Sequence, residues 1–198
     1  MITIVSSTNR EGSITYKVAT LYSKILQHIN IENQILDLRF LPKDFIFSNF
    51  SNSSTEDFII QVDNYINKAD KFIIISPEYN GSYPGIFKSF IDCIGNSYIK
   101  EKKVALVGIS TGRAGNLRGL DHLTALFHHL GAEVYSSKII ISLIHTLFDD
   151  KDNVLNDSYT LNLIQNQING FSTFWFSLES FDSIFNPNNF FCLMTLST

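Results

Sequence analysis

The chain has 198 residues, 44 % of them hydrophobic and 17 % charged, with a formal net charge of −4. This size and composition suit one globular domain with a large core, and the acidic balance argues against nucleic-acid binding. Two cysteines make no disulfide framework, Met1–Ser6 is too short for a signal peptide, and no run of about 18 apolar residues predicts a membrane span. We therefore expect a cytoplasmic protein that binds neither membranes nor nucleic acid.

Short apolar runs alternate with amphipathic segments along the chain. The predicted strands are residues 2–5, 34–38, 71–76, 104–109 and 138–143, the last with 133–135 as an extension. The predicted helices are residues 13–29, 58–69, 85–94, 117–130 and 159–171. Because polar and apolar residues do not alternate along these strands, the pattern predicts a parallel sheet that is buried on both faces. The alternation predicts a doubly wound α/β fold with five parallel strands in the order 2-1-3-4-5, and a ligand crevice between the first and third strands.

Two segments do not fit this alternation. Residues 39–55 form a long connection rich in Phe, Ser and Asn, which predicts either a functional loop or a short helix. Residues 177–198 are rich in aromatic side chains but have no clear period. We therefore divide the chain into a domain of residues 1–176 and a tail of residues 177–198, which is either an aromatic arm on a partner subunit or a poorly ordered appendage.

The loop after the first strand, residues 6–13, is rich in hydroxyl groups. It precedes a helix, so hydroxyls and backbone N–H groups converge at the helix N-terminus, where anions bind readily. Arg10 adds a forked donor that suits a phosphate. The alternative is a Ser-rich turn in which Ser13 caps the helix.

The loop after the third strand, residues 77–85, is the most informative segment. It offers backbone N–H groups, the Tyr79 ring and the Asn80 amide together at the carboxyl end of a buried strand. Those groups suit a flat ring rich in heteroatoms, such as a flavin. The alternative is a tight turn with Tyr79 packed on the core. Just beyond it, Lys88 and Asp92 are four residues apart on a helix, which predicts a surface ion pair.

The loop after the fourth strand, residues 110–118, is rich in small residues that let backbone approach a ring closely. Arg113 or Arg118 is expected either to meet the phosphates of a pyridine nucleotide or to lie in solvent or at a subunit interface. The five histidines have no metal-ligand spacing, and we expect them at the surface.

The run Pro77-Glu78-Tyr79-Asn80-Gly81-Ser82-Tyr83-Pro84-Gly85 resembles the flavin loop of the NAD(P)H-dependent FMN reductases, a flavodoxin-like group that includes chromate, quinone and azo-dye reductases. The resemblance extends from Met1 to about Phe171 and implies a three-layer α/β/α flavodoxin-like sandwich. It implies FMN as the cofactor and NADPH or NADH as the co-substrate. The cofactor-binding residues that it implies are Thr8, Arg10, Ser13 and Thr15 at the phosphate, Pro77, Glu78, Tyr79, Asn80, Gly81 and Ser82 at the ring, largely through main-chain donors, and Thr111, Gly112 and Arg113 beside it.

Two positions depart from the family pattern. Ser7 stands where the family usually has glycine, and Thr15 stands where asparagine is common. If position 7 requires a positive φ, Ser7 strains the loop.

The resemblance implies an enzyme in which FMN passes hydride from NAD(P)H to a small-molecule acceptor, such as a quinone, a flavin, an azo compound or a metal ion. The cofactor supplies the chemistry, so no catalytic side chain is expected. Family members commonly form dimers or tetramers, so we expect a homodimer or homotetramer. The alternatives are a flavodoxin-type electron carrier, which Arg10 and the modest charge disfavour, and a non-catalytic flavin-binding protein.

Overall fold

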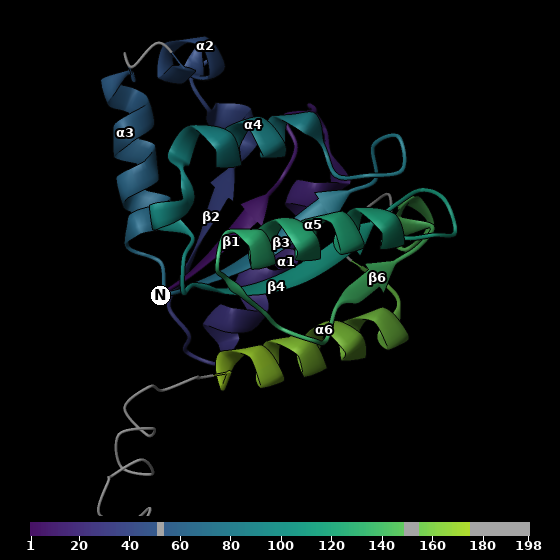
Figure 1. The fold of residues 1–198 in the computed structure, drawn as a ribbon. Coiled ribbons are helices and arrows are strands. Elements are labelled where there is room, and N and C mark those ends of the chain that lie inside the picture. Colours follow the sequence, from purple (N-terminus) through teal and green to yellow (C-terminus); the bar gives the residue numbers. More distant parts are fainter. Residues whose placement is uncertain (51–53, 149–154, 175–198) are drawn as a thin grey trace, which may run out of the picture.

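The computed structural model describes residues 1–50, 54–148 and 155–174, and in it a central parallel sheet lies between two layers of helices (Figure 1). Within these residues the sheet contains β1 (Ile2–Ser6), β2 (Asn33–Asp37), β3 (Lys71–Pro77), β4 (Lys103–Ile109), β5 (Glu133–Val134) and β6 (Ile139–Ile141). The strand order β2-β1-β3-β4-β5 confirms the predicted order, and every pairing is parallel. The buried side chains of β1, β3 and β4 explain why these strands read as apolar runs.

The predicted fifth strand is divided into β5 and β6, which pair with the first and last residues of β4 respectively. Between them, Tyr135 packs its ring 5.7 Å from the ring of Phe171 and 5.2 Å from that of Phe174. The carbonyl of Ser137 accepts a hydrogen bond from Gln167. The segment between β5 and β6 thus contacts α6 (Ser158–Ser172) and the residues just after it, while the N–H of Tyr135 still donates to the carbonyl of Val104 in β4 at 2.8 Å.

The helices cover both faces of the sheet, as predicted. Side chains of α1 (Ile14–His28) and α6 (Ser158–Ser172) belong to the core on one face, and those of α3 (Glu56–Val62), α4 (Gly85–Ile94) and α5 (Leu117–His129) to the core on the other. Figure 1 shows α4 and α5 on the side of the sheet opposite α6.

One helix begins earlier than predicted. Thr55 caps α3, its side chain accepting the N–H of Phe58, and Glu56 and Asp57 follow in the first turn. A threonine cap followed by acidic residues is a helix-start signal, because both complement the free N–H groups there. The helix then continues as a π-helical turn, Asp63–Asn67.

The long connection of residues 39–55 carries short helical segments. These are the 3-10 turn Leu38–Phe40 and the helix α2 (Phe45–Phe50), whose Phe45 is buried in the core. Two further 3-10 turns are Asn96–Tyr98 and Ile144–Thr146. The predicted tail of residues 177–198, and with it the boundary at 176, lies outside the described residues.

Buried polar groups attach α6 to the sheet. Gln167, which is 1 % exposed, accepts the hydroxyl of Tyr22 at 2.7 Å and donates to the carbonyl of Leu106 at 3.1 Å. Lys71 donates to the carbonyls of Phe171 at 3.0 Å and Ser172 at 2.8 Å, at the end of α6. Burial lowers the pKa of this lysine. Lys71 thus binds carbonyl groups of the last turn of α6, where a helix has few backbone donors of its own, although the carbonyl of Phe171 also accepts the N–H of Phe174 at 3.2 Å.

Because the strands are parallel, the loops after β1, β3, β4 and β6 all emerge at one edge of the sheet. This edge brings the three predicted loops together. Among the described helices, none has the length and apolarity needed to cross a bilayer.

Candidate functional site

A cavity of about 280 Å³ lies at the carboxyl edge of the sheet. Its size is near the lower end of the range for small-molecule sites, roughly 300–1,000 Å³. The lining residues are Arg10, Glu11, Gly12, Ser13, Ile14, Thr15, Pro77, Glu78, Tyr79, Ile109, Ser110, Thr111 and Ile144. All three predicted loops therefore contribute to one cavity.

The first loop is held at its start by Ser7. Its backbone N–H and its hydroxyl both donate to the carbonyl of Ile75, at 3.1 and 2.9 Å. Ser7 is not among the described residues with positive φ, so this position does not require glycine. The serine hydroxyl adds a hydrogen bond to β3 that glycine cannot make.

The same loop ends at the N-terminus of α1 with unused donors. Ser13 caps the helix by accepting the N–H of Thr15 at 3.1 Å, and it donates to the Thr15 hydroxyl at 2.8 Å. Within the described residues, the N–H groups of Glu11, Gly12 and Ser13 have no protein acceptor. Three free donors at a helix N-terminus, beside Arg10, form an anion-binding arrangement.

The second loop is a tight turn. Tyr79 and Ser82 exchange both backbone hydrogen bonds, at 2.8 and 3.0 Å, around Asn80 and Gly81. The φ angles of the two central residues, 52° and 76°, are both positive, as a type I′ turn requires. Asparagine and glycine tolerate this conformation best, which is why the pair occurs here.

The turn reduces the number of main-chain N–H groups that this loop can offer to a ligand. The N–H of Glu78 donates to the carbonyl of Ile109 at 2.9 Å, and those of Tyr79 and Ser82 are used within the turn. From Glu78 to Ser82, the N–H groups of Asn80 and Gly81 are therefore the two without a protein acceptor in the described part of the chain.

A hydroxyl pair joins the first two loops. The hydroxyls of Thr8 and Tyr79 lie 2.8 Å apart, and Thr8 Oγ1 also accepts the N–H of Arg10 at 3.2 Å. Thr8 is fully buried, so it reaches the site through Tyr79.

The third loop is tied to the segment after β6. The N–H of Ile144 donates to the carbonyl of Ser110 at 3.0 Å, and that of Leu143 to the carbonyl of Gly112 at 3.1 Å. These bonds place Ile144 in the cavity wall, a contribution that the sequence analysis missed. A buried amide, Asn116 Nδ2, also donates to the carbonyl of Ser76 at 3.0 Å and so joins this loop to the end of β3.

The predicted residues fall into two groups. Those that line the cavity are Arg10, Ser13, Thr15, Pro77, Glu78, Tyr79 and Thr111. Those that do not line it are Thr8, Asn80, Gly81, Ser82, Gly112 and Arg113. The lining residues that the sequence analysis missed are Glu11, Gly12, Ile14, Ile109, Ser110 and Ile144. Most of them could have been found from the predicted strand ends and helix start. Residues in or next to a loop at the carboxyl edge of the sheet lie at the same edge as that loop.

Other side chains lie at the surface as expected. Lys88 and Asp92 form an exposed ion pair at 2.6 Å, and all five histidines are exposed. Within the described residues, no group of three or more His, Cys, Asp or Glu side chains is placed to hold a metal ion. Arg113 and Arg118 are both exposed.

Removing the Tyr79 hydroxyl tests the link between the first two loops. Tyr79→Phe is expected to lower the free energy of unfolding by about 1 kcal/mol, the usual net value of one hydrogen bond. Tyr159→Phe, which removes a hydroxyl from an exposed tyrosine of α6, is the control. Urea unfolding of both variants measures the difference, and equal stabilities would show that the hydroxyl pair contributes nothing.

Comparisons with known proteins agree with this architecture. A family model described as NADPH-dependent FMN reductase matches residues 1–146. The FMN-dependent NADPH-azoreductases of Staphylococcus haemolyticus and Staphylococcus aureus (strain USA300) are 27 % and 28 % identical over 130 residues, covering 64 % of this chain and 69 % of each relative.

Solved structures show the same fold. The flavoenzyme NAD(P)H:(acceptor) oxidoreductase FerB from Paracoccus denitrificans superposes with a TM-score of 0.71 at 24 % identity, covering 86 % of this chain and 93 % of that one. A flavodoxin from the domain Archaea superposes with a TM-score of 0.56 at 13 % identity, over 87 % of this chain and 99 % of that one. These likenesses confirm the three-layer flavodoxin-like sandwich. Because the family model matches 146 of the 198 residues, the chain belongs to the NADPH-dependent FMN reductase family, and it is an NAD(P)H-dependent oxidoreductase with FMN as its cofactor, as the sequence predicts.

Proposed function

We propose that this enzyme binds FMN in the cavity at the carboxyl edge of the sheet and passes electrons from NADPH to azo compounds. The observation that carries the proposal is the convergence of three loops, with their free donors, on one cavity. The azo acceptor and the preference for NADPH rest on the relatives at 27 % and 28 % identity, which are FMN-dependent NADPH-azoreductases. Quinones, free flavins and metal ions are the other acceptors to compare.

The residues of the cavity fit both ends of FMN. The free N–H groups of Glu11, Gly12 and Ser13, together with Arg10, suit the phosphate. The hydroxyl of Thr15 lies beside them and takes the place that asparagine commonly occupies in the family. Toward the strand ends, Ile109 and Ile144 supply apolar surface for a ring.

The remaining residues orient the ring and exclude water. Bound FMN supplies the redox chemistry, accepting hydride from the nicotinamide and passing electrons to the acceptor. Asn80 and Gly81 do not line the cavity but follow Tyr79, which does, so their N–H groups are available to polar atoms of a ring that extends past Tyr79. Pro77, Ile109 and Ile144 reduce access of water from the side of the sheet.

An absorbance spectrum tests the proposal. The purified chain, mixed with FMN and separated from free flavin, is expected to retain a band near ~450 nm that bleaches on anaerobic addition of NADPH. Adding methyl red is then expected to restore the band while the dye loses its colour. A band that NADPH does not bleach would favour an electron carrier, and absence of bound flavin would contradict the proposed site. Comparing kcat/KM for methyl red with that for menadione ranks the acceptor classes.

We also propose that the chain forms a homodimer or homotetramer. The supporting observation is the exposure of large apolar side chains, including Phe40 at 71 % and Phe47 at 81 %, in and beside the long connection after β2. Apolar surface of this kind is often covered by another chain. Light scattering at micromolar concentration is expected to give at least twice the monomer mass, and a monomer would contradict this.

A further inference from the structure

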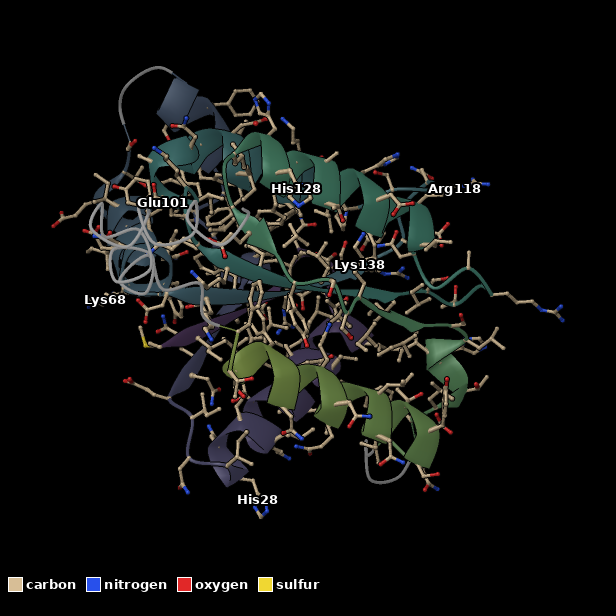
Figure 2. The ribbon with its side chains drawn as sticks, turned by 60° about the horizontal axis from the view of Figure 1, so that its bottom comes forward. His28, Lys68, Glu101, Arg118, His128 and Lys138 are labelled. Carbon is tan, nitrogen blue, oxygen red and sulfur yellow. The ribbon has the colours of Figure 1, made fainter. Side chains whose placement is uncertain are left out.

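A histidine outside the cavity contacts the Asn80–Gly81 turn. His122 lies on the exposed face of α5, and its Nδ1 is 2.9 Å from the hydroxyl of Ser82. One turn earlier on the same helix, a guanidinium nitrogen of Arg118 lies 3.8 Å from the position that a Cβ on Gly81 would occupy. Figure 2 shows Arg118 near one end of α5 and His128 toward the other, so the start of the helix is the part beside the turn.

The turn is therefore held from two sides. On one side, the Tyr79 hydroxyl pairs with Thr8, which belongs to the first loop. On the other side, the Ser82 hydroxyl pairs with His122. Tyr79 and Ser82 are joined by both backbone hydrogen bonds, so the two side-chain anchors act on one rigid unit.

We propose that His122 is a positioning residue for FMN, acting through Ser82 on the direction of the free N–H groups of Asn80 and Gly81. The inference rests on the proposed function, because it requires FMN in the cavity. His122 does not line the cavity and is not a catalytic residue. Its role is to hold the Ser82 end of the turn, because the Tyr79 hydroxyl and the N–H of Glu78 anchor only the end nearer β3.

The geometry sets a precise requirement on the side chain at position 122. The contact uses Nδ1, the ring nitrogen nearer the backbone. An asparagine places its amide group close to the position of Nδ1, whereas a glutamine reaches about as far as Nε2. Both side chains carry the same amide group, which accepts and donates hydrogen bonds. A difference between the two variants therefore reports the position of the polar group and not its type.

The experiment compares His122→Ala, His122→Asn, His122→Gln and Ser82→Ala in the full chain. FMN affinity is measured by quenching of flavin fluorescence, and the visible circular dichroism of bound FMN reports the surroundings of the ring. His122→Ala and Ser82→Ala are each expected to weaken FMN binding about three- to tenfold, the effect of one lost hydrogen bond. The double variant is expected to match the singles, because both remove the same bond. His122→Asn restores affinity to within about twofold and His122→Gln does not.

His128→Ala is the matched control, because His128 is an exposed histidine of the same helix. It is expected to leave both FMN affinity and the dichroism unchanged. Additive losses in the double variant, or a His122→Ala protein that binds FMN as His128→Ala does, would overturn the inference. If the His122→Ala protein fails to fold, Ser82→Ala alone tests the inference, and an FMN affinity unchanged in the Ser82→Ala protein would overturn it. Failure of the unaltered chain to bind FMN would overturn the proposed function itself, which is a different result.

Discussion

Replacing Gly115 with alanine is expected to lower the free energy of unfolding by about 2–4 kcal/mol, combining a strained backbone with a steric clash against the segment of β6. The φ angle of Gly115 is 56°, in the left-handed region that alanine avoids. A Cβ there would also lie less than 3.0 Å from Cγ2 of Ile140 and 3.1 Å from the hydroxyl of Ser142. Urea unfolding followed by far-UV circular dichroism measures the loss.

Gly115 takes part in a second close approach, to Gly108. A Cβ on Gly108, in β4, would lie less than 3.0 Å from the backbone carbonyl oxygen of Gly115, which cannot rotate away as a side chain can. We expect Gly108→Ala to be destabilised to a similar degree. Gly85→Ala is the control, because a Cβ at Gly85 meets nothing within 4 Å and Gly85 begins α4. Equal stability of the Gly115→Ala and Gly85→Ala proteins would show that the loop relaxes without cost.

Removing the guanidinium of Arg10 is expected to weaken FMN binding about 10- to 100-fold. A charge-assisted hydrogen bond is worth about 1.5–3 kcal/mol, and 1.4 kcal/mol corresponds to a factor of ten. Arg10 is exposed at the cavity, and Arg10→Lys is expected to recover only part of the affinity, because lysine keeps the charge but loses the fork. Fluorescence titration with FMN gives the three dissociation constants.

Measuring riboflavin affinity distinguishes a contact between Arg10 and the phosphate from a general effect of charge on binding. It carries the same ring without the phosphate, so Arg10→Ala is expected to leave riboflavin affinity unchanged. Lys24→Ala, which removes an exposed cation from helix α1, after the loop that carries Arg10, is the control for net charge. If Arg10→Ala lowered the affinities for FMN and riboflavin equally, the prediction that Arg10 contacts the phosphate would be wrong.

The strand order and the position of the site were predictable because they depend on short-range patterns. Apolar runs fix which segments are buried strands, and parallel pairing then places residues 6–13, 77–85 and 110–118 at one edge. The Asn80–Gly81 turn was also visible, because that pair favours positive φ.

The features that escaped prediction depend on partners distant in sequence. The fifth strand is divided at Tyr135, whose ring contacts Phe171, and no local pattern around residue 135 records that contact. Ile144 enters the cavity because its N–H bonds to Ser110, which belongs to another loop. Whether Ser7 strains the loop could not be decided from the sequence for the same reason. Its fit to the loop depends on the carbonyl of Ile75, so a comparison of residue types alone did not show it.

The attachment of α6 shows that the end of the family match and the end of the packed domain lie at different residues. The family match ends at residue 146, before α6 begins at Ser158. Yet Gln167 of that helix satisfies the buried hydroxyl of Tyr22 and the carbonyl of Leu106. A fragment that ends at residue 146 would leave these polar groups without a partner, and it would uncover the part of this apolar face of the sheet that α6 covers beside α1. For this chain the family match therefore ends before the last helix that the packing of the core requires, so a truncated protein should end after α6.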